Sequence, residues 1–158
     1  MAAEAPDGVR RRVQAWRDRH PEAAAFQLIP AAPDLTSDES VDDLRATLRE
    51  ASTEFVAAGA GPLGLVIIDT LSASAPGVAE NESQMMSMLL QRLQTMAQEL
   101  NLLVLVVGHT GKDSTRGIRG WSGQHAAADT VIMLRRSDEN PHRIARLDEA
   151  IPVAQAIA

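Results

Sequence analysis

The fold is decided by the stretch Leu63-Gly64-Leu65-Val66-Ile67-Ile68-Asp69, a continuous apolar run that ends in an acid. Runs of this kind are typical of central parallel strands that are covered on both faces, because such strands have no solvent-facing side on which polar residues would alternate. A second apolar run extends from Leu102 to Val107 and is followed by Gly108-His109-Thr110. The two runs predict strands of a mostly parallel sheet.

Three amphipathic helices are expected around these strands. The first opens at Asp7-Gly8 and ends at Pro21. The second begins with Ser40 as N-cap and stops at Gly59-Ala60-Gly61-Pro62, and the third begins at the capping-box-like Asn81-Glu82-Ser83-Gln84. Apolar residues at helical spacing predict the buried stripes: Val9, Val13 and Trp16 in the first helix, Val41, Leu44, Leu48, Ala51 and Phe55 in the second, and Met86, Leu89, Leu93, Met96 and Leu100 in the third.

Further strands are expected at Ala25–Ile29, at Asp129–Leu134 and at Arg143–Leu147, with a loop over residues 31–39. Strands that alternate with amphipathic helices predict an α/β fold with a mostly parallel sheet. Ligands of such sheets bind at the carboxyl ends of the strands. The polar residues expected at these ends are Asp69, Thr70, His109 and Thr110.

Composition excludes several classes of function. The 158 residues suit one domain or a large piece of one, and the absence of cysteine excludes disulfides, thiolate metal sites and a cysteine nucleophile. The net charge of −6 argues against nonspecific nucleic-acid binding by the whole surface. With neither a signal-peptide pattern nor an apolar run long enough to span a membrane, we expect a cytoplasmic protein.

The basic residues comprise 14 arginines and the single lysine Lys112. A phosphate-binding P-loop requires the sequence G-x-x-x-x-G-K-[ST]. Lys112 follows Gly111, but Asp113 comes next and Val106 stands where the first glycine should be. The chain therefore contains no P-loop sequence.

Asp69 and His109 are the strongest chemical candidates. An ionised carboxylate at a strand end is the pattern of a Walker B acid, which holds Mg²⁺ beside a nucleotide phosphate, although Asp69 could equally cap the turn that follows. A histidine leaving a buried strand could sense a phosphate or orient water, although alone it is more often structural.

Two other segments have weaker signals. The loop Arg116-Gly117-Ile118-Arg119-Gly120-Trp121-Ser122-Gly123 combines basic residues, glycines and a tryptophan, which suits contact with phosphate or single-stranded DNA but is also typical of a solvated loop. Glu4, just before the first helix, could act as a general base or be an ordinary terminal residue.

Taken together, these segments resemble a family. Leu65–Leu71, Gly77-x-x-Glu80-Asn81, Val107–Asp113, Arg116–Gly120, and Ser122-Gly123 with Ala127-Ala128-Asp129 occur in one order. That set resembles the RepA-like branch of the RecA-fold ATPases, the hexameric replicative helicases and primase-helicases of plasmids and phages. The resemblance covers roughly residues 3–148 and implies an α/β, RecA-like P-loop NTPase core, with a mostly parallel sheet flanked by helices.

The resemblance also implies cofactors, partners and roles. The cofactors would be Mg²⁺ and ATP, and the partners a nucleoside triphosphate, single-stranded DNA and further copies in a homo-hexamer, with no membrane. Asp69 and Thr70 would bind the metal and nucleotide, His109 would couple the γ-phosphate to DNA, and Glu4 would activate water. Lys112, Arg116 and Arg119 would face DNA, and one of Arg135, Arg136, Arg143 and Arg146 would reach a neighbouring subunit's nucleotide.

The departures from the family define a further expectation. The P-loop, its strand and its helix precede the Glu4 motif in the family, and this chain begins at that motif. We therefore expect residues 1–148 to be an N-terminally truncated RecA-like ATPase domain without its P-loop strand, inactive alone, with 149–158 as a short tail. The alternatives are a non-enzymatic module that joins a ring, a gene fragment, or an unrelated α/β hydrolase, the last disfavoured because no G-x-S-x-G sequence is present.

Overall fold

The computed structural model describes residues 6–20, 25–79, 82–108, 128–136 and 143–150. Packing divides the chain into two units, residues 1–121 and residues 122–158. Each unit is described by itself.

The first unit is built around two parallel strands, β1 (Leu65–Asp69) and β2 (Leu103–Val107). Their register pairs Leu65 with Leu103 and Asp69 with Val107, so both strands end at the same edge of the sheet. The continuous apolar runs thus form neighbouring parallel strands, which confirms the α/β fold with helices flanking a parallel sheet. A 3-10 turn, η1 (Ser72–Ser74), follows β1 directly.

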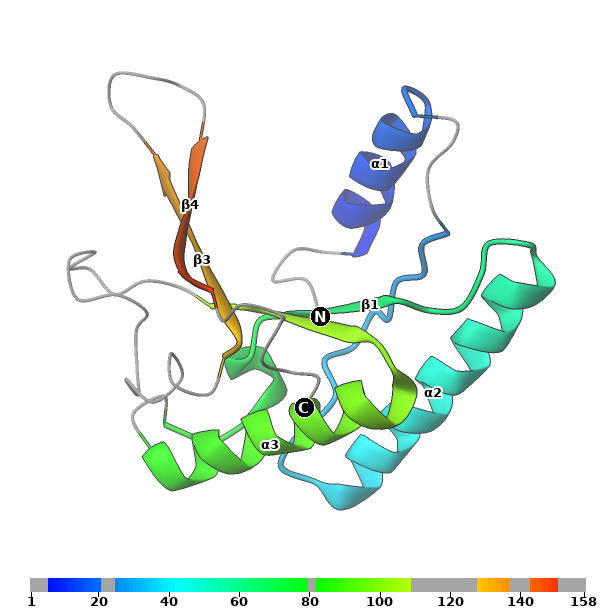
Figure 1. Ribbon diagram of the computed structural model, residues 1–158. Coiled ribbons are helices and arrows are strands. Elements are labelled where there is room, and N and C mark those ends of the chain that lie inside the picture. The colour runs from blue at the N-terminus through cyan, green and yellow to red at the C-terminus, as the bar shows by residue number, and fades with distance from the viewer. Residues whose placement is uncertain (1–5, 21–24, 80–81, 109–127, 137–142, 151–158) are drawn as a thin grey trace. The chain divides into compact units, whose positions relative to one another are not determined.

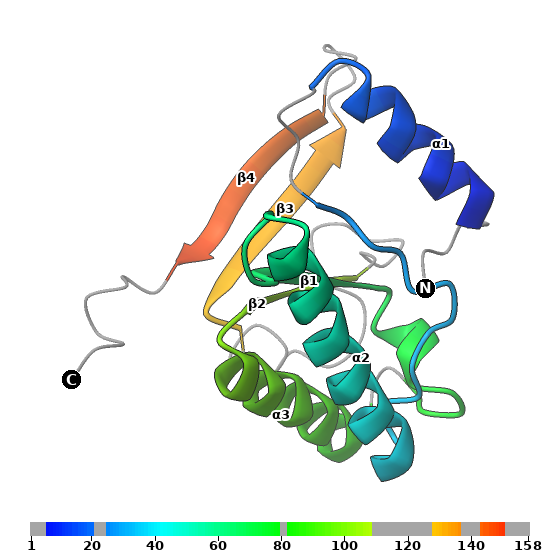
Figure 2. The same cartoon turned by 90° about the vertical axis from the view of Figure 1, so that its right-hand side faces the viewer.

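Two long helices, α2 (Asp38–Ala57) and α3 (Ser83–Leu100), lie side by side on one face of this strand pair (Figures 1 and 2). The core between helices and sheet contains Leu35, Val41, Leu44, Leu48, Ile68, Leu71, Ala75, Met86, Leu89, Leu93 and Met96. The predicted stripes of both helices are therefore confirmed, except that Phe55 and Leu100, at their carboxyl ends, are only partly buried.

The predicted N-cap of α2 is wrong by three residues, whereas α3 begins within the segment expected to start it. The N-cap of α2 is Ser37 and not Ser40, and the Ser37 side chain accepts a hydrogen bond from the Ser40 backbone N–H. Ser40 instead lies in the first turn, where its hydroxyl accepts from the Asp34 backbone N–H at 2.9 Å. The N-cap of α3 is Glu82, and its side chain makes no capping hydrogen bond; Asn81, the first residue of the capping-box-like segment, lies outside the described residues.

The first helix, α1 (Pro6–Arg17), has no buried residue, although its apolar stripe predicts a packed face. The segment Ala25–Ile29, expected to be a strand, is not part of any strand. Only Ile29 of this segment packs against the core. The predicted strand at this position is therefore wrong, because so short an apolar run can also cross the surface as irregular chain.

The second unit contains an antiparallel pair, β3 (Thr130–Arg136) and β4 (Arg143–Ala150). The pairing has an irregularity between Val131 and Ile132. Both strands were expected from the sequence. They pair antiparallel, whereas the sequence predicts a mostly parallel sheet.

Candidate functional site

The site predicted at Asp69 lies at the carboxyl end of β1. Side chains at alternate positions of a strand point to the same face, so Asp69 shares a face with Leu65 and Ile67 and faces away from α2 and α3. Its side chain is partly buried. Among the residues that the structure describes, the Asp69 carboxylate has no hydrogen bond or ion pair. A partly buried carboxylate without a partner is costly unless a cation or a donor approaches it.

Thr70 is joined to Asp69 by a cis peptide bond and is buried. Its hydroxyl lies 3.0 Å from the Ser72 hydroxyl and accepts a hydrogen bond from the Ala73 N–H at 3.3 Å. The next residue, Leu71, donates its N–H to the Val107 carbonyl at 3.3 Å. These bonds shape the turn after the strand and hold it against the end of β2.

A loop residue and a helix residue support this turn from behind. Leu35 donates its N–H to the Ser74 carbonyl at 2.8 Å, and its own carbonyl accepts from Arg92 Nη1 of α3 at 2.8 Å. The other end of the Arg92 guanidinium bonds to Asp38 at the start of α2. The chain of contacts from α3 through Leu35 to η1 therefore fixes the segment that directly follows Asp69.

The loop before α2 is ordered by its own side chains. Asp34 Oδ1 accepts from the Thr36 hydroxyl at 2.6 Å and from the Thr36 N–H at 2.9 Å. The hydrogen bond from the Thr36 side chain, followed by the one from its backbone, lowers the pKa of Asp34 below its ordinary value. Neither Asp34 nor Leu35 was predicted to matter for the site. A segment rich in Pro, Asp and Ser predicts a turn, but it does not show which of its residues contact other parts of the fold.

Most of the other predicted site residues lie outside the described residues. These are Glu4, His109, Lys112, Arg116 and Arg119. His109 comes two positions after Val107, the last residue of β2. The described part of the chain shows nothing more about its position. Of the candidate arginine fingers, Arg135 and Arg136 end β3, whereas Arg143 and Arg146 belong to β4.

The residues at the end of β1 fit Mg²⁺ better than a transition metal. No group of three or more His, Asp or Glu side chains within the described ranges could hold a metal ion. Zinc requires such a group, because the protein supplies three or four of its ligands. Mg²⁺ needs only one or two carboxylates, since water and nucleotide phosphates complete its coordination. Asp69 can supply one such carboxylate.

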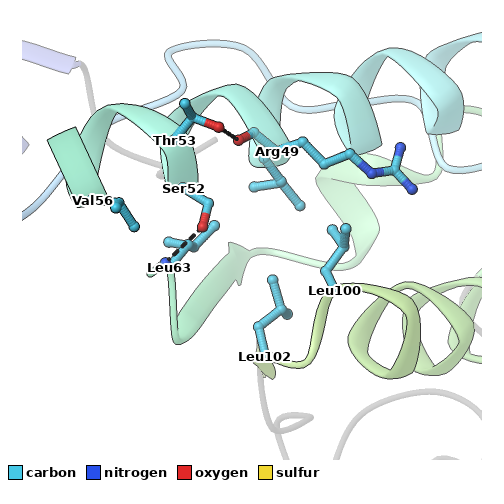
Figure 3. Close-up of a pocket in the computed structure, with 8 residues that line it drawn as sticks. Arg49, Ser52, Thr53, Val56, Leu63, Leu100 and Leu102 are labelled. Atoms are coloured by element: carbon cyan, nitrogen blue, oxygen red, sulfur yellow. Dashed lines mark hydrogen bonds between the residues drawn. The ribbon is translucent and has the colours of Figure 1, made fainter. Parts of the chain in front are cut away.

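An open groove of about 380 Å³ lies elsewhere, between the ends of α2 and α3 (Figure 3). Its apolar lining includes Leu63 and Leu102, which precede β1 and β2. The Ser52 hydroxyl accepts the Leu63 N–H at 3.1 Å and holds this end of the sheet to α2 (Figure 3). A strand of five residues is about 16 Å long, so the groove and Asp69 lie at opposite edges of the sheet.

A family model described as an AAA domain matches residues 1–115. No curated protein matches the chain. Where the structure describes helices, none combines the length and the apolar character needed to cross a membrane.

Proposed function

Because the chain belongs to the AAA domain family, a family of ATPase domains, we propose that its site binds a nucleoside triphosphate with Mg²⁺, and that Asp69 ligates the metal. The observation that carries this proposal is the Asp69 carboxylate, which is partly buried and unpaired among the described residues, at the end where two parallel strands stop together. A bound cation would offset the cost of burying that charge.

The remaining residues of the proposed site act around this metal. Thr70 shapes the turn that presents the carboxylate, since its hydroxyl is already bonded to Ser72 and Ala73. On the resemblance to the RepA-like ATPases, His109 would contact the γ-phosphate and Glu4 would activate the attacking water. Because the sequence contains no G-x-x-x-x-G-K-[ST], we expect the 158-residue chain to hydrolyse ATP far more slowly than a complete ATPase.

We also propose the finer assignment, a replicative helicase domain of the RepA-like type. It would form a homo-hexamer around single-stranded DNA, with Lys112, Arg116 and Arg119 in contact with the DNA backbone. The resemblance of the ordered motifs supports this assignment, and the composition of the loop is compatible with it.

The metal site is tested with Mn²⁺, which favours the same oxygen ligands as Mg²⁺ and is detected by electron paramagnetic resonance. We expect the chain to bind Mn²⁺–ATP and the Asp69→Asn variant to bind it at least about tenfold more weakly, a loss of about 1.4 kcal/mol. The matched control is Asp43→Asn, which removes an exposed carboxylate from α2. Equal affinity of the two variants would exclude Asp69 as a ligand.

The helicase assignment is tested separately by fluorescence anisotropy with labelled single-stranded DNA. Replacement of Lys112, Arg116 and Arg119 by alanine should weaken binding and reduce its dependence on salt, because fewer counterions are released from the phosphates. Sedimentation velocity with and without Mg²⁺–ATP reports the ring. Unchanged DNA binding after the triple substitution, together with a monomeric chain, would contradict the helicase assignment. The proposed metal site would not be affected by that result.

A further inference from the structure

One face of the β1–β2 pair is apolar and open. Its side chains are exposed by 45% at Leu65, 51% at Ile67, 65% at Leu103 and 42% at Leu105. The register pairs Leu65 with Leu103 and Ile67 with Leu105, so the four side chains form one continuous patch, which we call the open face. Parallel strands are rarely left with a solvated apolar face.

The same unit contains a helix, α1, whose apolar stripe is not buried, although the Trp16 ring stacks on the His20 ring with their centroids 4.6 Å apart. No residue of α1 is buried, and its Trp16 side chain is 52% exposed. Val9, Val13 and Trp16 are spaced by four and three positions, which places them on one side of the helix. Arg10 and Arg11 lie off this stripe, and both bond to Asp7 within the helix.

We propose that α1 packs on the open face through Val9, Val13 and Trp16. Neighbouring strands are about 4.8 Å apart and a helix with its side chains is about 10 Å across, so one helix covers two strands. The stripe from Val9 to Trp16 is about 10 Å long and two successive outward side chains on a strand are about 7 Å apart, so the stripe is long enough to cover both. Arg10 and Arg11 then remain in solvent.

The size of the open face favours α1 of the same chain over a second copy. The exposed fractions of its four residues add up to about two whole residues. Each partner of a stable complex buries about 800 Å². An intramolecular helix needs much less area, because the chain already holds it near the sheet at an effective concentration of about millimolar.

Docking of α1 would also place the helix beside the Asp69 carboxylate. Asp69 follows Leu65 and Ile67 at alternate positions on the same face of β1, so its carboxylate lies at the border of the open face. A helix over that face would exclude water from one side of the carboxylate. The docking itself does not depend on the proposed nucleotide, and its test contains none.

The absence of cysteine permits a cross-linking test without background in the full chain. We expect the double variant Val13→Cys/Ile67→Cys to form an intramolecular disulfide under mild oxidation, detected as a faster-migrating monomer in a non-reducing gel. The matched control is Arg11→Cys/Ile67→Cys, because position 11 lies about 200° around the helix from position 13. The Val13 pair should cross-link at least about tenfold faster than the control, since docking orients only one of the two thiols toward the sheet.

Equal rates for the two pairs, or disulfide-linked dimers in place of the fast monomer, would overturn the proposal. A second measurement avoids introduced cysteines. In a Trp121→Phe background Trp16 is the only tryptophan, and we expect its fluorescence to be protected from acrylamide. The further substitution Ile67→Asp should remove that protection while circular dichroism shows that the helices persist. Unchanged quenching after Ile67→Asp would also contradict docking.

Discussion

Leu35 offers the sharpest test of how the turn after Asp69 is supported. Its side chain is fully buried in the core beneath the sheet, although it belongs to a loop. The substitution Leu35→Ala removes most of that side chain and leaves a cavity that the neighbouring helices fill only in part. Such substitutions cost about 2–5 kcal/mol. Since domains are stable by only about 5–15 kcal/mol, we expect a loss of a large fraction of the free energy of unfolding.

Urea denaturation followed by circular dichroism measures this loss. With a slope of about 2 kcal/mol per molar, a loss of about 3 kcal/mol lowers the midpoint by about 1.5 M. The matched control is Val56→Ala, because Val56 is 55% exposed on α2 and its substitution should change stability by less than about 0.5 kcal/mol. A midpoint for Leu35→Ala that equals that of Val56→Ala would refute the packing of this loop into the core.

Two further predictions concern the same support. Arg92→Met should lower the free energy of unfolding by about 1–2 kcal/mol in urea melts, because it removes a charged donor to the Leu35 carbonyl. The control Arg10→Met removes an exposed ion pair and should change the free energy of unfolding by less than about 0.5 kcal/mol. Equal effects of the two substitutions would contradict this role for Arg92. The lowered pKa of Asp34 means that its contribution to stability is present above the carboxyl's unfolded pKa and is lost as the pH falls through the lowered folded value. Asp34→Asn should therefore flatten the acid limb of the stability–pH curve, and an unchanged limb would show that the bonds from Thr36 contribute nothing.

The helical part of this fold could be predicted closely because its signal is periodic. Leu44, Leu48, Leu89 and Leu93 recur at helical spacing, and all four are buried in the structure. The parallel strands were equally clear, since uninterrupted apolar runs flanked by turns are typical of buried parallel strands. Helix beginnings were harder to predict, because Ser37 and Ser40 are chemically equivalent as N-caps and only tertiary contacts choose between them.

What the sequence could not predict depends on contacts between distant residues. Nothing in the local pattern shows that Leu35 enters the core or that Arg92 reaches its carbonyl across 57 positions. The exposed face of β1 was missed for a related reason, since a continuous apolar run predicts cover on both sides without identifying the covering element. Asp69 could be chosen as a site residue because a charge directly after such a run stands at the strand end, where ligands of parallel sheets bind.

The central claim, that Asp69 holds the metal of a bound nucleotide at the carboxyl edge of the sheet, is tested most directly by paramagnetic broadening with Mn²⁺–ATP in a ¹⁵N-labelled sample. We predict that the amide signals of Thr70, Leu71 and Val107 broaden first, while those of Leu63 and Leu102, at the opposite edge, remain sharp. Asp69→Asn should abolish the difference between the two edges. Broadening that begins at the opposite edge, or that persists at Thr70 in the Asp69→Asn variant, would contradict the account.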